Sequence, residues 1–341
     1  MKLFGLGLKN IKNYAHDYFE SRNRIREIKR KNDFSTLTKV TITVKDNIFS
    51  HFIQAQTPGQ LGVWKNSAFV TVLQPDINLA INAPNPYVRY SSDPEKNWLL
   101  HIEPPAYIQK SGLDSPEALK KFGRVYTSHP ALIAMGGKFI ASPPYVQWHI
   151  ATGAYAGDKK PTHDYDFLAS AEMPKKEIGL VAINSNMSQL SGHKLRADFI
   201  TRVLESGVDI AMYGGSNWSK YKQYKGRAAE GKWEVYSPAK YVLVIENEVS
   251  DLYWSEKFTD AVLCYCTPIY YGSRKIGDYF PKGSYVALDI NRDDAVDQLN
   301  EILRSDFFEK NIEHLTAARN LILTKHNMFN MISAEVEKLK A

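Results

Sequence analysis

The chain is poor in cysteine and has no long apolar run. Only two of its 341 residues are cysteine, Cys264 and Cys266, which argues against a disulfide framework and a cysteine-rich metal site. One residue separates them inside a segment expected to be helical, so they are placed badly to bridge each other. No apolar run approaches the ~20 residues of a membrane-spanning helix. The first residues also lack the apolar core and cleavage site of a signal peptide. We therefore expect a reduced, cytoplasmic protein.

Signatures of several common protein classes are missing as well. The chain has no G-x-G-x-x-G dinucleotide fingerprint, no G-x-S-x-G nucleophile elbow and no H-E-x-x-H zinc motif. These gaps disfavour a dehydrogenase, a serine hydrolase and a zinc peptidase. The net charge of +6 is modest, and no recognition motif accompanies it, so we predict no nucleic-acid partner.

The chain does have the pattern of an α/β protein of two domains. A hydrophobic content of 44% is enough for two cores. In the first half, strands are predicted at 39–44, 67–73, 98–102 and 122–127. After a Gly-, Asp-, Lys- and Pro-rich linker at 153–174, strands at 177–183, 208–213, 241–245, 267–271 and 285–290 alternate with helices, one of them at 194–205. We assign 1–35 to a basic helical extension, 36–160 and 175–305 to two α/β domains, and 306–341 to carboxyl-terminal helices.

The most informative segment begins with a strand. Tyr241 to Ile245 is a continuous apolar run, typical of a buried parallel strand. Glu246 and Asn247 end it with polar groups. In open α/β sheets, ligands bind outside the carboxyl ends of the strands. A ligand site is therefore predicted just after this run.

A helix is predicted shortly afterwards. Ser255 suits its cap, and Glu256 and Lys257 would lie in its first turn. The free N–H groups and positive dipole end of a helix amino terminus suit phosphate, and Lys257 adds a full positive charge. The segment therefore predicts a site for a phosphorylated or nucleotide-linked ligand.

The order of residues in this segment resembles the donor-binding signature of the α-1,3-fucosyltransferases, glycosyltransferase family 10. The signature is carried by Glu246, Asn247, Tyr253, Glu256, Lys257, Pro268 and Gly272. The chain has Ser255 where members usually have Thr, and Ile245 where they usually have an aromatic residue. The resemblance implies a GT-B architecture, in which two Rossmann-like domains face each other across a cleft. Residues 36–160 would be the acceptor side and 175–305 the donor side.

The resemblance also implies the chemistry. It implies inverting transfer of fucose, or a related deoxysugar, from a GDP-sugar to a glycan hydroxyl, with no metal and no cofactor beyond the donor substrate. Glu103, in L-L-H-I-E-P-P, resembles the glutamate of the family's E-S-P segment, the proposed general base, although Pro104 replaces the serine. The alternative for Glu103 is a strand-end carboxylate that hydrogen-bonds a turn.

Further residues are expected at the donor. Ser185-Asn186, followed by Arg196 and Phe199, resembles the family's S-N…R…F segment, whose arginine meets the diphosphate. The fixed fork of donors on Arg suits that task, and Lys194 competes for it.

The downstream signature residues have implied roles as well. The resemblance implies that Lys257 places a second positive charge on the phosphates and that Glu256 binds the ribose or sugar hydroxyls. It also implies that Tyr253 stacks on the donor or hydrogen-bonds to it. Each also has an ordinary explanation as a helix-surface or packed turn residue. For Asn247, capping of the strand end and contact with the nucleotide both stay open.

Two other functions remain alternatives. One is a metal-dependent transferase using Asp164-Tyr165-Asp166 as an Asp-x-Asp motif, although this motif falls in the predicted linker and not directly after a strand. The other is a non-catalytic sugar- or nucleotide-binding protein that keeps the fold.

The basic stretch at 22–31 has two interpretations. With Leu8, Ile11, Tyr14, Tyr18 and Ile25 on one helical face, residues 1–31 would lie on the inner face of an anionic membrane and meet a lipid-linked acceptor. Alternatively, this is a solvated basic helix packed on the body of the protein, and we favour this interpretation.

Overall fold

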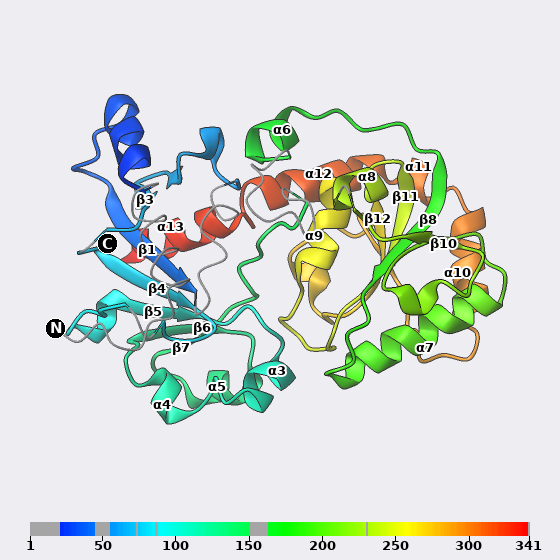
Figure 1. Ribbon diagram of the computed structural model, residues 1–341, viewed down its shortest axis with the longest axis horizontal. Coiled ribbons are helices and arrows are strands. Elements are labelled where there is room, and N and C mark those ends of the chain that lie inside the picture. The colour runs from blue at the N-terminus through cyan, green and yellow to red at the C-terminus, as the bar shows by residue number, and fades with distance from the viewer. Residues whose placement is uncertain are drawn as a thin grey trace. The chain divides into compact units, whose positions relative to one another are not determined.

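The computed structural model describes residues 21–44, 55–72, 74–85, 88–150, 163–229 and 231–339. These residues form two compact units (Figure 1). The first takes the described residues up to Gln147, together with Asp164–Asp166 and those from Asn327 onward. The second takes those of Trp148–His163 and of Phe167–His326. The last helix, which the sequence grouped with the carboxyl-terminal helices, thus counts with the first unit.

The first unit is built on a sheet ordered β2-β3-β1-β4-β5-β6-β7. Its strands are β1 (Thr38–Val44), β2 (Val63–Trp64), β3 (Ser67–Phe69), β4 (Ile77–Ile81), β5 (Asn97–Leu100), β6 (Arg124–Thr127) and β7 (Phe139–Ala141). Only the β2–β3 pairing is antiparallel. The four predicted strands are confirmed in place, three of them shorter than expected, whereas β2, β4 and β7 were missed.

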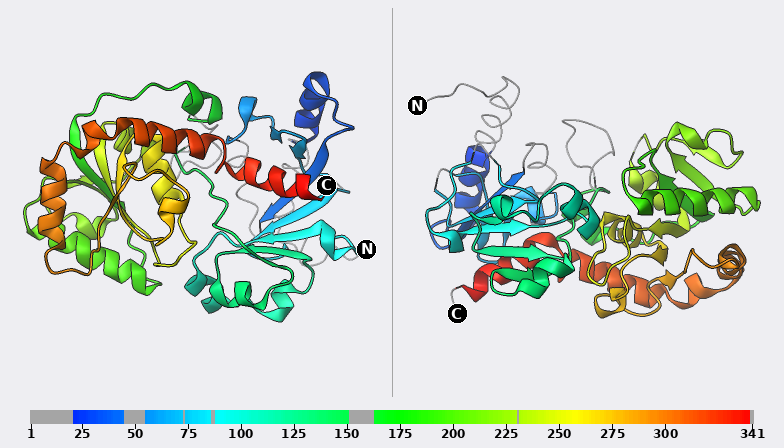
Figure 2. Two further views of the ribbon diagram at one scale, coloured as in Figure 1. Left: turned by 180° about the vertical axis from the view of Figure 1, so that it is seen from behind. Right: turned by 90° about the horizontal axis from the view of Figure 1, so that it is seen from below.

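Side chains alternate across this sheet, so each face has its own core. On one face Trp98 and Leu100 pack with Phe329 and Ile332 of α13 (Met328–Lys338), as Figure 2 shows for that helix. On the other face Leu99 packs with residues of and beside the short helices α4 (Pro116–Leu119) and α5 (Pro130–Met135). The last helix is therefore part of the first unit's core.

Residues 21–31 form a helix that is packed on the first unit. Ile28 is fully buried against Leu37, Ala68 and Val70, with Ile25 beside it. The apolar side of this part of the helix is thus covered by protein, as the second interpretation expects, and its basic side chains are mostly exposed. Leu8, Ile11, Tyr14 and Tyr18 lie outside the described residues. None of the helices in the described ranges combines the length and the apolarity needed to span a bilayer.

The second unit contains a wholly parallel sheet ordered β10-β9-β8-β11-β12-β13. Its strands are β8 (Ile178–Asn184), β9 (Ala211–Gly214), β10 (Tyr224–Gly226), β11 (Ala239–Ile245), β12 (Thr267–Tyr271) and β13 (Val286–Ala287). Numbered along the chain, this is the Rossmann order 3-2-1-4-5-6. All five predicted strands are confirmed in place, with β9 and β13 shorter than expected, and β10 was missed.

Helices cover both faces of this second sheet. They are α7 (Ser191–Glu205), α8 (Lys232–Tyr236), α9 (Glu256–Leu263), α10 (Ala295–Arg304), α11 (Phe307–Lys310) and α12 (Ile312–Leu323). Figure 2 shows α7 on one side of the sheet and α9 with α12 on the other. The chain therefore leaves β8 and β11 in opposite directions. The carboxyl ends of these two neighbouring strands form the switch point where Rossmann folds bind ligands.

One local prediction was wrong. Cys264 and Cys266 do not lie inside a helix: Cys264 is the residue after α9, and Cys266 directly precedes β12. Tyr265 between them has a φ of 57°, a left-handed conformation that ends the helix. Both cysteines are buried and free.

Two further α-helices are α3 (Pro105–Lys110) in the first unit and α6 (Tyr165–Ser170) in the segment predicted to be the linker.

Candidate functional site

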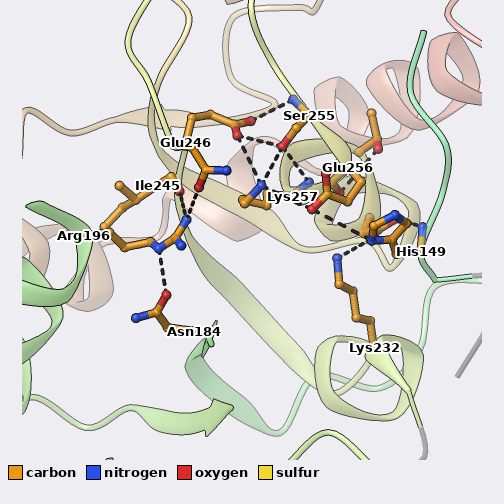
Figure 3. Close-up of polar contacts among 12 residues, drawn as sticks. His149, Asn184, Arg196, Lys232, Ile245, Glu246, Ser255, Glu256 and Lys257 are labelled. Atoms are coloured by element: carbon orange, nitrogen blue, oxygen red, sulfur yellow. Dashed lines mark hydrogen bonds and ion pairs between the residues drawn. The ribbon is translucent and has the colours of Figure 1, made fainter. Parts of the chain in front are cut away.

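Arg196 joins the two strand ends at the switch point of the second unit. It lies on α7 and is 7% exposed. Its Nε donates to Asn184 Oδ1 at 2.7 Å, and its Nη1 donates to the Ile245 carbonyl at 3.1 Å and to Asn247 Oδ1 at 2.8 Å (Figure 3). The guanidinium therefore holds β8 and β11 together. Among the described residues no hydrogen bond uses Nη2.

A glycine allows α7 to approach this point. A Cβ on Gly192 would lie 1.9 Å from the Asn247 carbonyl oxygen, so only glycine fits there. The loop before the helix contains the predicted Ser185 and Asn186. Ser185 is half-buried, and its Oγ accepts from the Met187 amide at 3.5 Å, while Asn186 is exposed. These two residues thus lie at the carboxyl end of β8, beside the strand ends that Arg196 ties.

Glu246 is turned into the protein. Its side chain is buried, Oε1 accepts from the Ser255 amide at 2.8 Å, and Oε2 accepts from Ser255 Oγ at 2.7 Å. Burial raises the pKa of this carboxyl against the opposing effect of Lys257. The predicted Glu246 therefore supports the corner from within by fixing the residue that caps the helix.

The predicted cap of α9 is confirmed. Ser255 Oγ accepts from the Lys257 amide at 3.4 Å. The Lys257 side chain folds back over the cap: Nζ donates to Ser255 Oγ at 3.0 Å and to Glu256 Oε1 at 3.2 Å, and lies 3.7 Å from Glu246 Oε2. The corner thus has a half-buried ammonium group at a helix amino terminus, an arrangement that suits an anion.

Glu256 is ringed by positive or protonatable groups. Burial of its carboxyl favours the neutral form, but Lys257, His149 and Lys232 together outweigh burial and hold its pKa far below the usual value. It is therefore an ionised acceptor at neutral pH, about a fifth exposed.

Three residues around Glu256 escaped the sequence analysis. His149 Nδ1 lies 4.0 Å from Glu256 Oε1. The buried Asp260 accepts from the His149 and Ile150 amides at 3.1 and 3.3 Å, and from Lys232 Nζ at 2.6 Å. His149 and Asp260 are 111 positions apart, and no spacing motif links them. Only the periodicity of α9, which puts Asp260 one turn after Glu256, carried a signal.

Tyr253 is buried as well. Its side chain and backbone together are 2% exposed, and its amide donates to Ser250 Oγ at 3.1 Å. The neighbouring Trp254 is fully buried against Phe280. The aromatic pair therefore forms the packed floor of the loop between β11 and α9.

Glu103 belongs to the first unit, whereas the other predicted site residues belong to the second. It follows β5 at the carboxyl edge of the sheet and is half-buried. The preceding residues are fixed, because the Ile102 amide donates to Asn82 Oδ1 at 2.8 Å and the His101 amide to the Tyr126 carbonyl at 2.9 Å. Glu103 thus occupies the ligand-binding edge of a parallel sheet.

The Asp-x-Asp pair has local partners. Asp164 Oδ2 accepts from Gln60 Nε2 at 2.7 Å, and Asp166 Oδ2 accepts from the Gly59 amide at 2.8 Å. Both carboxylates thereby fasten the start of α6 to the first unit. In the described part of the chain, no group of three or more His, Cys, Asp or Glu side chains is arranged to hold a metal ion.

Comparison with known proteins gives a family match in the second unit. Residues 173–315 match the model of "Glycosyltransferase family 10 (fucosyltransferase) C-term". A curated relative, "GDP-fucose protein O-fucosyltransferase 3" of Canis lupus familiaris, is 33% identical over 89 residues. That alignment covers 25% of this chain and 19% of the relative, so the match spans about a fifth of the relative's length.

Two solved structures are similar to the chain, and the first of them shows the same fold. A DNA-modifying β-glucosyltransferase is 11% identical with a TM-score of 0.50, covering 87% of this chain and 98% of that one. An α1,3-fucosyltransferase solved with GDP-fucose is 13% identical with a TM-score of 0.47, covering 84% and 90%. The expected architecture of two α/β domains with parallel sheets, the GT-B type, is confirmed. The family matched over residues 173–315 is glycosyltransferase family 10, the fucosyltransferase family that the sequence resembles.

Proposed function

We propose that the chain transfers fucose, or a related deoxysugar, from a GDP-sugar to a glycan hydroxyl with inversion at the sugar carbon. The observation that carries this proposal is the corner after β11, where Lys257 and the amino terminus of α9 lie at the Rossmann switch point of a family 10 domain. The name of the canine relative supports GDP-fucose as the donor.

In this proposal Lys257 and Arg196 bind the diphosphate. Lys257 Nζ is divided between Ser255 and two glutamates in the free protein and turns to the phosphate oxygens when the donor arrives. Arg196 offers its remaining Nη2. Charge then develops on the departing GDP next to a fixed cation, which lowers the barrier. The ionised Glu256 accepts from a ribose or sugar hydroxyl.

Glu103 is the proposed general base. As the acceptor oxygen bonds to the anomeric carbon, the bond from that carbon to the diphosphate breaks and GDP leaves with the electron pair. The acceptor proton passes to the Glu103 carboxylate. This scheme needs no metal ion, so we expect a chelator to leave transfer unchanged, whereas an Asp-x-Asp enzyme would lose it.

The donor proposal is tested by thermal unfolding with nucleotides. GDP should raise the melting temperature more than UDP, CMP or ADP, because only a ligand of the native state stabilises it by mass action. Lys257→Met should reduce that shift, whereas Lys310→Met, at an exposed position of the same unit, should leave it unchanged. Equal shifts from all four nucleotides would contradict the GDP assignment.

The catalytic proposal is tested with Glu103→Gln. Turnover of GDP-fucose with a glycan acceptor should fall by about 10² to 10⁴, while donor binding survives. Glu117→Gln, an exposed glutamate of the same unit, serves as the control. Full turnover in Glu103→Gln would rule out the base, and donor binding without any transfer or hydrolysis would favour the non-catalytic alternative.

A lipid-linked glycan is the acceptor class that we propose. The exposed Arg22, Arg26 and Lys29 of the helix at 21–31 suit the anionic inner surface of a membrane by charge alone. Co-sedimentation with anionic but not neutral vesicles, lost at high salt, is the expected result.

A further inference from the structure

His149 presents an imidazole to the corner that the proposed donor occupies. Its side chain is 51% exposed, and Nδ1 lies 4.0 Å from Glu256 Oε1 (Figure 3). Both residues belong to the second unit. The ring is therefore open to a ligand that reaches Glu256 and Lys257.

The backbone of His149 is held by a carboxylate of a buried ion pair. Asp260 is fully buried on α9, one turn after Glu256, and accepts from the amides of His149 and Ile150. Its other oxygen accepts from Lys232 Nζ, which is 13% exposed. A buried ion pair is weak evidence for stability, because desolvation offsets the attraction. Its evident effect here is positional: it sets His149 beside Glu256.

The charges around the ring are balanced before any ligand arrives. The cluster contains three carboxylates and three cations, namely Glu246, Glu256, Asp260, Arg196, Lys232 and Lys257. Partial burial of the ring lowers the pKa of His149, and Lys232 and Lys257 lower it further against the opposing effects of Glu256 and Asp260, so above pH 7 the imidazole is mainly neutral before a ligand binds. A diphosphate diester adds about one negative charge per phosphate group, which this balance leaves uncompensated.

We propose that His149 is a donor-binding residue that takes up one proton from solvent when a nucleoside diphosphate sugar binds. The imidazolium donates from one ring nitrogen to a diphosphate oxygen and faces Glu256 with the other. Asp260 and Lys232 act as positioning residues. The groups that face the ring are Glu256, Lys257 and Asp260 on α9 and Lys232 on α8. This inference rests on the proposed function and adds a charge-supplying residue to it.

The test is calorimetric titration of the protein with GDP-fucose between pH 6 and 8.5, each pH in two buffers of different ionisation enthalpy. The donor is preferred to GDP, since a terminal phosphate titrates by itself at about pH 6. The wild-type protein should take up as much as one proton. Its Kd should weaken by as much as about tenfold per pH unit above the pKa of the free ring.

Two variants complete the experiment. His149→Gln keeps the backbone amide and should bind more weakly, with no proton uptake and no pH dependence. His314→Gln, an exposed histidine of the same unit, should behave as wild type. Donor binding without proton uptake in the wild type, or uptake that persists in His149→Gln, overturns the role of His149 alone. Failure of the wild type to bind any nucleotide sugar overturns the proposed function and this inference with it.

Discussion

Breaking the Lys232–Asp260 pair should destabilise the second unit far more than breaking an exposed pair of the same geometry. The two atoms of the buried pair are 2.6 Å apart, with side chains 13% and 0% exposed. In Lys310–Asp306 they are 2.7 Å apart, with side chains 71% and 64% exposed. Because the separations are nearly equal, any difference in coupling reports burial.

The magnitude follows from what each change leaves behind. Asp260→Asn retains an oxygen for the His149 amide but leaves the Lys232 ammonium without its charged partner. Lys232→Met leaves the buried Asp260 carboxylate without its charged partner. Each should lower the free energy of unfolding by about 3–5 kcal/mol. The double variant leaves no unpaired buried charge. Its loss of unfolding free energy should therefore be smaller than the sum of the two single losses, by a coupling energy of about 2 kcal/mol or more.

The four free energies of the double-mutant cycle are measured by urea unfolding, with tryptophan fluorescence as the signal, and the exposed pair is expected to show little or no coupling. Trp233, next to Lys232 in the chain, provides a nearby probe. If both pairs gave the same coupling, within about 0.5 kcal/mol, the argument that Asp260 is fixed by a desolvated partner would be refuted.

Three further outcomes are expected. Ser255→Ala removes the side-chain cap of α9 and the hydroxyl donor to Glu246 Oε2, while the backbone amide still donates to Oε1. It should lower the free energy of unfolding by about 1–2 kcal/mol in urea; an unchanged midpoint would contradict this. Gly272→Ala should cost about 1–3 kcal/mol in the same assay, because its Cβ would lie 2.4 Å from the Tyr270 hydroxyl and 2.6 Å from Glu246 Cγ. Burial lowers the pKa of His101 to about 4, so its contribution is fully present above pH 6.5 and is lost as pH falls toward 4. It amounts to as much as about 3 kcal/mol, and the profile of His101→Gln should be correspondingly flatter between those pH values.

The parts of the fold that were predictable are those whose signal is local. The apolar run from Tyr241 to Ile245 predicted β11, and Ser255 predicted the start of α9. β4 was missed because Asn78 interrupts its apolar run; that side chain is buried and donates to Asn97 Oδ1. The packing of α13 against the first sheet has no local signal in the sequence, because it depends on contacts between residues far apart in the chain.

The candidate site divides in the same way. Glu256 and Lys257 were found because they are neighbours in a motif. His149 and Lys232 were not, because only the folded chain brings them to Asp260. The sequence also could not tell that the carboxylate of Glu246 points inward to the helix cap, since the same residue type serves equally as a ligand contact or as a support.

Because α13 belongs to the first unit, the ribosome must translate the whole second unit before the first can be completed. Strands β1 to β7 leave the ribosome before the second unit, but the side chains that cover one face of their sheet are translated after it; they include Met328, Phe329, Ile332 and Val336. The second unit is complete by His326 and can fold while the first still exposes Trp98 and Tyr126. A nascent or truncated chain that stops before Asn327 would therefore carry a complete second unit and a first sheet with one apolar face exposed, which makes it a substrate for chaperones and proteases.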